Sequence, residues 1–181
     1  MKVVQTAIPE VLIFEPKVFS DNRGFFFECY QQKFFDAATG YPVSFVQDNH
    51  SGSQQNVLRG LHYQVQQAQG KLIRVIAGAI YDVAVDIRQN SSTFGKYVGA
   101  ELSSENKRML WIPEGFAHGF LTLASWNEVY YKATSFYAPA HERSIRWDDP
   151  EISVDWPLND VKPIVSGKDE AGAWLRDAEL F

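Results

Sequence analysis

The chain has 181 residues, of which 45% are hydrophobic and 22% charged, and this composition excludes disorder over its whole length. The net charge of −5 comes from the C-terminal end, because residues 1–140 hold 12 acidic and 12 basic side chains whereas residues 141–181 hold 10 and 5. Without a basic stripe or an apolar run of roughly 18 residues, we expect neither nucleic-acid nor membrane partners. The lone Cys29 excludes an intrachain disulfide and suits a reducing cytoplasm.

Short segments that alternate apolar and polar residues run through most of the chain and predict an all-β protein. Clusters of Gly, Pro, Asn, Asp and Ser separate these segments and mark turns. Short strands at this spacing favour a β-sandwich or barrel. In chain order, the predicted strands span residues 11–19, 24–30, 43–49, 57–64, 71–77, 81–87, 96–102, 108–112, 117–124 and 128–137.

Two helices are predicted outside this pattern. The first spans residues 31–39 and ends at Gly40, a residue type that often terminates helices, and the second spans residues 169–178. Three prolines between residues 148 and 163 predict an ordered but irregular segment. We therefore expect a single domain over residues 1–181, with an irregular and helical C-terminal appendage from about residue 148.

Residues 113–118, with the sequence PEGFAH, resemble the second histidine motif of cupin barrels. Proline fixes one φ angle and glycine permits a left-handed one, so His118 would emerge from a tight turn at the start of a strand. The first cupin motif would place two histidines two residues apart, but here His62 is followed by Gln64, and no acid occurs before Asp82. Because catalytic divalent metals usually take three protein ligands, we expect no metal site. The alternative reading is a turn followed by a core histidine.

Chemistry without a metal needs a general base, a general acid and a group that stabilises negative charge. His62 is the natural base, since histidine titrates near neutrality, and Lys71 at the start of an apolar strand is a cationic candidate. Tyr131 and Tyr137 lie six residues apart, so we expect them on one face of a strand that borders a ligand groove. The alternatives are a hydrogen-bonded core histidine, a solvated lysine and packed core tyrosines.

Two arginines, Arg23 in a turn and Arg59 in a strand, could pair with phosphate oxygens. The alternative for Arg23 is a solvated side chain. Arg59 and His62 have opposite parity, so a regular strand would point them to opposite faces. Gly60 between them could mark a bulge that resets the alternation, or one of the two assignments is wrong.

Motifs along nearly the whole chain resemble those of the dTDP-4-dehydrorhamnose 3,5-epimerase family. They are DNRGFFFE at 21–28, FVQDNHS at 45–51, VLRGLHYQ at 57–64, QGKL at 69–72, WIPEGFAHGF at 111–120, YKAT at 131–134 and SGKD at 166–169. The resemblance implies a cupin-like jelly-roll sandwich or barrel that uses no metal and no redox cofactor. It also implies epimerisation of a dTDP-linked 4-keto-6-deoxyhexose at carbons 3 and 5, in the cytoplasmic synthesis of dTDP-L-rhamnose.

The same resemblance implies roles for the matching residues. The catalytic set would be His62 as base, Asp169 as its partner, Tyr131 as proton donor if a nearby cation lowers its pKa, and Lys71 as stabiliser of the enolate. The substrate-binding set would be Arg23, Phe26, Glu28, Gln47, Asn49, Arg59, His118, Tyr137, Glu142 and Lys168.

Within the binding set, the two arginines would contact the diphosphate, and Tyr137 and Phe26 would stack on thymine. A homodimer is also implied, in which the N-terminal strand region reaches the partner's site. In that arrangement Arg23, Phe26 and Glu28 would serve the other subunit.

Two other classes of function fit parts of the pattern. A metal-dependent cupin oxygenase or isomerase would contain stoichiometric iron, zinc or manganese. A non-catalytic sugar-binding jelly roll would bind a sugar or nucleotide without exchanging its protons.

Overall fold

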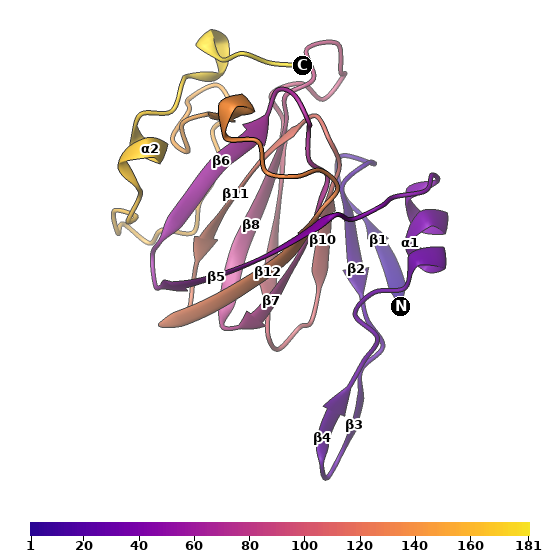
Figure 1. Ribbon diagram of the computed structural model, residues 1–181. Coiled ribbons are helices and arrows are strands. Elements are labelled where there is room, and N and C mark those ends of the chain that lie inside the picture. The colour runs from indigo at the N-terminus through magenta and orange to yellow at the C-terminus, as the bar shows by residue number, and fades with distance from the viewer.

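Two antiparallel sheets pack face to face in the computed structural model, which describes all 181 residues (Figure 1). The first sheet contains, in spatial order, β1 (Lys2–Gln5), β2 (Leu12–Glu15), β10 (Met109–Ile112), β7 (Lys71–Ala77), β12 (Trp126–Ala133) and β5 (Gln47–Gln54). The second contains β13 (Glu142–Ser144), β6 (Leu58–Gln64), β11 (Phe116–Thr122), β8 (Ala79–Asp86) and β9 (Tyr97–Ser103). A hairpin of β3 (Phe19–Asp21) and β4 (Gly24–Phe26) projects from this body (Figure 1). The predicted all-β jelly-roll sandwich is confirmed.

Apolar side chains bury both faces of the six-stranded sheet. Between the sheets lies a cluster of 14 buried residues, among them Ile73 and Leu102. The outer face is covered by α1 (Gln32–Thr39), whose Phe35 ring lies 5.1 Å from the Trp111 ring. The Gln31 side chain caps the start of this helix and Gly40 ends it with a φ of 84°, so the predicted helix is confirmed.

The C-terminal segment covers the outer face of the five-stranded sheet. The alternating residues Val83 and Val85 of β8 face outward and pack with Ile152, Trp156 and Leu175 of that segment. The segment is irregular from residue 148, as predicted, and Trp156 anchors it by donating from its indole nitrogen to the Trp147 carbonyl at 2.9 Å. No helix of the structure is long and apolar enough to cross a membrane.

The predicted helix over residues 169–178 is wrong. The structure contains a short helix, α2 (Gly167–Glu170), and then a 3₁₀ turn, η2 (Leu175–Asp177). Between them, Ala173 forms an isolated parallel bridge with Ile145. The Ala173 N–H donates to the Ser144 carbonyl at 2.9 Å, and the Ala173 carbonyl accepts from the Arg146 N–H at 2.9 Å. This bridge requires extended backbone, so a continuous helix cannot form there.

Several predicted strand boundaries also differ, and β1 was not predicted. β4 ends at Phe26, four residues before the predicted end at residue 30. β2 ends at Glu15 rather than continuing to residue 19, because Pro16 cannot donate to a ladder. β5 begins at Gln47 and runs to Gln54, and β12 ends at Ala133, four residues before the predicted end. The 3₁₀ turn η1 (Pro139–His141) and β13 follow without having been predicted.

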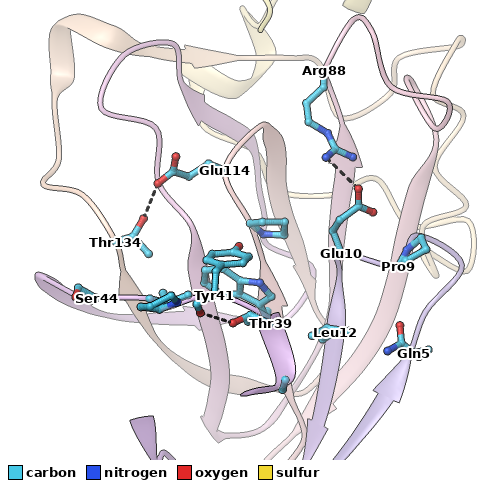
Figure 2. Close-up of a pocket in the computed structure, with 15 residues that line it drawn as sticks. Gln5, Pro9, Glu10, Leu12, Thr39, Tyr41, Ser44, Arg88, Glu114 and Thr134 are labelled. Carbon is cyan, nitrogen blue, oxygen red and sulfur yellow. Dashed lines mark hydrogen bonds and ion pairs between the residues drawn. The ribbon is translucent and has the colours of Figure 1, made fainter. Parts of the chain in front are cut away.

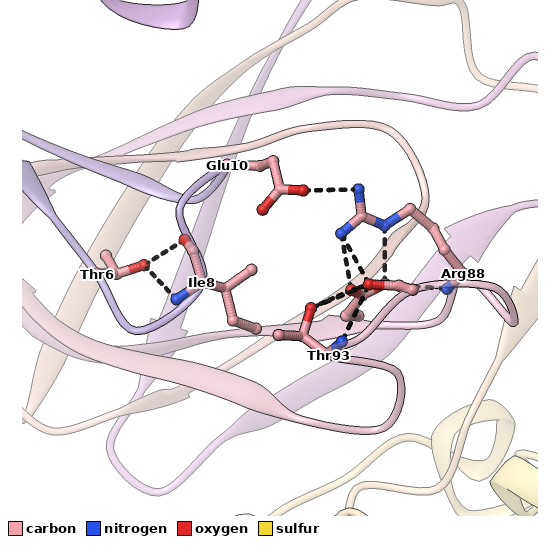
Figure 3. Close-up of polar contacts among 7 residues, drawn as sticks. Thr6, Ile8, Glu10, Arg88 and Thr93 are labelled. Carbon is pink, nitrogen blue, oxygen red and sulfur yellow. Dashed lines mark hydrogen bonds and ion pairs between the residues drawn. The ribbon is translucent and has the colours of Figure 1, made fainter.

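A buried carboxylate fixes the corner between β8 and the first strands (Figure 3). Asp86 is fully buried and accepts from Arg88 at 2.7 Å and 2.9 Å, from Ser91 at 2.5 Å and from Thr93 at 2.6 Å. Burial would raise the pKa of Asp86, but these hydrogen bonds outweigh it and hold the pKa well below its usual range. Arg88 also donates to Glu10 at 3.1 Å, which ties this corner to the turn before β2.

Candidate active site

A pocket of about 280 Å³ lies between the two sheets and collects most of the predicted reactive side chains. It is lined by Asn49, His50, Ser51, Arg59, His62, Lys71, His118, Phe120 and Tyr131. These residues come from β5, β6, β7, β11 and β12, so the pocket forms only when both sheets are assembled. Of the four predicted catalytic residues, only Asp169 does not line it, because it lies behind His62.

A bulge in β6 brings Arg59 and His62 to this one pocket. His118 of β11 pairs with His62, and Phe120 pairs with Arg59. These partners are two residues apart on β11 but three apart on β6, so the register shifts and β6 contains one extra residue. Gly60 sits at the shift with a φ of 128°, and a Cβ there would lie 2.5 Å from the Gly119 Cα. The conformation and the close approach both require glycine, so the predicted bulge is present.

His62 forms a close pair with a carboxylate from the C-terminal appendage. Its Nε2 lies 2.5 Å from Oδ1 of Asp169, whose side chain is 4% exposed against 28% for His62. Burial would raise the pKa of Asp169, but the His62 hydrogen bond and charge, with bonds from Ser166 and the Gly60 N–H, lower it overall. An ionised Asp169 accepts a hydrogen bond from the Nε2–H of His62, which leaves Nδ1 of the ring unprotonated and able to accept a proton.

A second histidine–carboxylate pair lies beside the first. His118 is the register partner of His62, and its Nε2 lies 2.6 Å from Oδ1 of Asp82. Both side chains are buried, and Oδ2 of Asp82 has no hydrogen-bond partner. Burial lowers the pKa of His118, assisted by the charges of Lys71 and His62 and opposed by Asp82, so this imidazole favours its neutral form.

Lys71 is a buried amine at the start of β7, with 8% of its surface exposed. Burial lowers its pKa to about 8, while the negative charges of Asp82 and Glu142 act in the opposite direction. The amine therefore remains mostly protonated at neutral pH and places a positive charge inside the pocket.

Tyr131 lies on β12, opposite Asn49 of β5 and Ile73 of β7. Burial raises its pKa, the charge of Glu142 acts in the same direction, and Arg59 opposes both. The expectation that a nearby cation lowers the pKa of this phenol is therefore wrong, because desolvation outweighs the effect of Arg59. Tyr131 keeps its proton at neutral pH and is able to donate it.

A polar cluster lies beside the pocket on the strand β13 and the helix α2. Glu142 Oε2 accepts from the Tyr137 hydroxyl at 2.6 Å and lies 2.5 Å from the Lys168 ammonium. The Gln47 side chain accepts from the Tyr137 backbone N–H at 2.8 Å. The prediction that Tyr137 and Tyr131 share one face of a strand is wrong. β12 ends at Ala133, and Tyr137 lies in the loop that follows.

The three predicted site residues of the N-terminal region lie apart from the pocket of this chain. Arg23 and Phe26 line a separate hollow on the β3–β4 hairpin, and Glu28 is exposed just after it. The hairpin itself projects from the sandwich (Figure 1). The Arg23 guanidinium pairs with Asp21 of the same hairpin at 2.5 Å. The aromatic rings of Phe25 and Phe26 are 60% and 71% exposed.

Sequence reasoning missed Asp82 as a functional residue, although a signal was present. The alternation of Val83 and Val85 with their neighbours puts Asp82 on the opposite, inward face of β8. An acid on the inner face of a sandwich strand needs a buried partner, and the structure supplies His118. Gln64, at the position of a metal ligand, is also buried and bonds only to the backbone of Gln67, Phe136 and Ala138.

A second pocket, of about 780 Å³, contains none of the predicted site residues. It lies near the end of α1 and is lined by Pro9, Pro42 and Trp111 among others. Figure 2 shows its charged groups already engaged, with Arg88 bonded to Glu10. No set of three His, Cys, Asp or Glu side chains is arranged to hold a metal ion in this pocket or elsewhere in the structure.

Comparison with known proteins identifies relatives over almost the full length. The family model described as dTDP-4-dehydrorhamnose 3,5-epimerase matches residues 5–177. The dTDP-4-dehydrorhamnose 3,5-epimerase of Pseudomonas aeruginosa is 59% identical over 100% of this chain and 99% of that protein, and the Salmonella typhimurium enzyme is 58% identical over 99% and 98%. A crystal structure of the Legionella pneumophila epimerase RmlC, in complex with dTDP-4-keto-L-rhamnose, superposes with a TM-score of 0.95 at 50% identity, covering 98% of this chain and 94% of that one.

Proposed function

The chain belongs to the dTDP-4-dehydrorhamnose 3,5-epimerase family, and from that premise we propose how its residues divide the reaction between them. The protein is an isomerase of nucleotide-sugar metabolism with a cupin-like fold. It epimerises dTDP-4-dehydro-6-deoxy-D-glucose at carbons 3 and 5 and yields dTDP-4-dehydro-L-rhamnose, in the biosynthesis of dTDP-L-rhamnose.

The reaction inverts two carbons that flank one ketone. Removal of a proton from either carbon gives an enolate, because the 4-keto group accepts the electron pair. Return of a proton to the opposite face of the sugar completes each inversion. The protein must therefore supply a base on one face, an acid on the other and a positive group near the 4-keto oxygen.

His62 is the base in this proposal, and the observation that carries it is the pair of His62 with Asp169 across the pocket from Tyr131. Asp169 fixes the tautomer that leaves Nδ1 free and stabilises the imidazolium that forms. Tyr131 is the acid: its raised pKa keeps the phenol protonated until a carbanion-like centre approaches.

Lys71 stabilises the enolate oxygen, and His118 contacts the sugar. The protonated Lys71 supplies a buried positive charge where little water screens it, so its attraction for a developing oxyanion is strong. His118 is held by Asp82 and presents its ring to the same pocket as a sugar-side contact.

The nucleotide half of the substrate would lie between Arg59 and the Tyr137 loop. The Arg59 guanidinium donates only to the Ser53 hydroxyl, at 3.0 Å and 3.1 Å, so its charge is available for a diphosphate. Tyr137 offers a 53% exposed ring for thymine, and the polar side chains of Gln47, Asn49, Glu142 and Lys168 surround it as further substrate contacts.

We also propose a homodimer in which the β3–β4 hairpin enters the partner's pocket. The exposed rings on the hairpin need a cover, and Arg23, Phe26 and Glu28 have no substrate to meet in their own chain. Equal mixtures of His62→Ala and Arg23→Ala protein test this directly. If the hairpin crosses over, mixed dimers contain one complete site and activity reappears, whereas two sites built within one chain would stay inactive in the mixture.

The proposal takes residues 1–181 as one catalytic domain, because the appendage after residue 148 supplies Asp169 to the site. It places the enzyme in the cytoplasm, where the free thiol of Cys29 would stay reduced.

Incubation with the substrate in deuterated water tests the division of roles. The wild-type enzyme should incorporate deuterium at carbons 3 and 5, and His62→Ala should incorporate none. Tyr131→Phe should exchange protons on the His62 face without inverting the carbons, because the base can return a deuteron only where it removed a proton. Inversion at normal rate in Tyr131→Phe would overturn the assignment of the acid.

A further inference from the structure

Gln64 lies two residues after His62 on β6, and its amide bonds to the loop that carries Tyr137. Nε2 donates to the Phe136 carbonyl at 3.2 Å and to the Gln67 carbonyl at 2.7 Å, and Oε1 accepts from the Ala138 N–H at 2.9 Å. The side chain is 4% exposed. Two of its three bonds thus fasten the backbone directly before and directly after Tyr137.

The loop of residues 134–138 has little other backbone support. It follows the end of β12, and it makes only two backbone–backbone hydrogen bonds. The Thr134 N–H donates to the Gly70 carbonyl at 3.0 Å, and the Ala138 carbonyl accepts from the His141 N–H at 2.9 Å. Gln69 donates to the Ser135 carbonyl at 2.8 Å and Gln47 accepts from the Tyr137 N–H. Side-chain amides therefore replace a neighbouring strand along this loop, and Gln64 makes the only side-chain hydrogen bonds to Phe136 and Ala138, the two residues that flank Tyr137.

The Tyr137 ring depends on this support, because its own side chain has little packing. The ring is 53% exposed, and its hydroxyl bonds to Glu142 at 2.6 Å. A ring in such a position is oriented by its backbone. An unfastened loop would populate other positions, and a ligand that needs one of them would bind more weakly.

We infer that Gln64 is a positioning residue for nucleotide recognition: it fixes the loop so that the Tyr137 ring is already placed to stack on the base of the substrate. The inference rests on the proposed function, in which Tyr137 is the stacking platform. It concerns binding and not the proton transfers, so the residue should affect affinity and leave the chemical step intact.

The test compares Gln64→Leu with the wild-type enzyme in dTDP binding and in turnover. Leucine has a similar size but no hydrogen-bonding atoms. We expect the Kd for dTDP and the KM for the keto-sugar to rise about tenfold, within the range for loss of a stacked base, while kcat at saturating substrate stays within about twofold. Gln66→Leu, an exposed position in the following turn, is the matched control and should change neither constant.

A double-mutant cycle separates positioning from general damage. If Gln64 acts through the Tyr137 ring, Gln64→Leu combined with Tyr137→Ala should bind dTDP no more weakly than Tyr137→Ala alone. Additive losses, or a fall in kcat with unchanged KM, would overturn the inference. If Gln64→Leu does not fold, Gln64→Met keeps the length of the side chain while losing all three hydrogen bonds, and it should raise KM without lowering kcat in the same cycle.

The same measurements distinguish this inference from the proposed function. An unchanged Kd in Tyr137→Ala would reject the stacking assignment itself. A weakened Kd in Tyr137→Ala together with an unchanged Kd in Gln64→Leu would reject only the role of Gln64.

Discussion

The two histidine–carboxylate pairs of this molecule have nearly the same geometry and very different surroundings. His62 lies 2.5 Å from Asp169 and His118 lies 2.6 Å from Asp82, and the two histidines face each other across β6 and β11. His62 is 28% exposed to the pocket, whereas the side chain of His118 is 8% exposed. A histidine–carboxylate pair becomes a base only where a substrate can reach it, and a buried pair serves as a fixed part of the wall.

The origin of the carboxylate also differs. Asp82 comes from β8, the strand that pairs with the strand of His118. Asp169 comes from a short helix 107 residues after His62, in a segment that joins the sheet through packing and isolated backbone bridges rather than as a strand. The reactive pair therefore depends on tertiary docking, and the buried pair depends on sheet formation alone.

The largest expected effect separates the two histidines. His62→Ala should lower kcat by about a thousandfold or more, because general-base catalysis typically contributes 10²–10⁴. His118→Ala should keep measurable proton exchange, since it removes a wall contact and leaves the base in place. Steady-state turnover and deuterium incorporation measure both variants, and equal losses in the two would remove the distinction.

The next effect concerns the partner of the base. Asp169→Asn keeps the shape of the side chain but can donate to Nε2, so it favours the tautomer that blocks Nδ1 from accepting a proton. We expect kcat to fall by at least about a hundredfold, because a histidine held in the wrong tautomer cannot act as the base. The Kd for dTDP should be nearly unchanged. Wild-type activity in this variant would show that His62 needs no orienting carboxylate.

The buried amine of Lys71, which lines the same pocket as both histidines, predicts a pH dependence. The pKa of Lys71 is about 8, below its ordinary value of 10.5, so the folded enzyme loses this positive charge as the pH rises through about 8. We expect kcat/KM of the wild-type enzyme to fall above that pH. In Lys71→Met, kcat/KM should be lower at every pH and should not fall in this range. The unfolded chain keeps the proton up to higher pH, so folding stability should rise between pH 8 and 10.5 in the wild type relative to Lys71→Met.

The smallest effect on activity belongs to the buried carboxylate. Asp82→Asn removes a charged hydrogen bond to His118 and should lower the free energy of unfolding by about 1–3 kcal/mol, measured by urea denaturation. Turnover near neutral pH should fall less than about tenfold. The exposed pair of Asp48 with Lys132 provides the control, because Asp48→Asn should cost at most about 1 kcal/mol. If Asp82→Asn lost proton exchange, the Asp82–His118 pair would be as important for catalysis as the Asp169–His62 pair, and the contrast between them would be wrong.

The sheets could be predicted from the sequence because their residues alternate with a period of two. The bulge at Gly60 was also foreseeable, since Arg59 and His62 could share a pocket only if the alternation was reset there. The C-terminal appendage could not be predicted in the same way. Its helix is interrupted by a bridge from Ala173 to Ile145, and that contact between distant segments leaves no local pattern.

The site was predicted less completely than the fold, for two physical reasons. A resemblance supplies residue types, but the pKa of Tyr131 depends on how deeply the finished sandwich buries it, and burial opposed the expected direction. The position of Tyr137 depends on amide bonds from three glutamines on other segments rather than on the strand that precedes it. The pKa of Tyr131 and the position of Tyr137 both depend on contacts between distant segments of the folded chain, and the spacing of residues along the sequence does not reveal these contacts.

The late position of Asp169 has a consequence for the newly made chain. Synthesis proceeds from the N-terminus, so the chain contains His62 and most strands of both sheets before it contains Asp169, which follows His62 by 107 residues. A nascent barrel can close around its pocket while the imidazole still has no carboxylate to orient it. Catalytic competence is therefore acquired only when the segment that carries Asp169 docks, and that segment is among the last parts of the chain to be made.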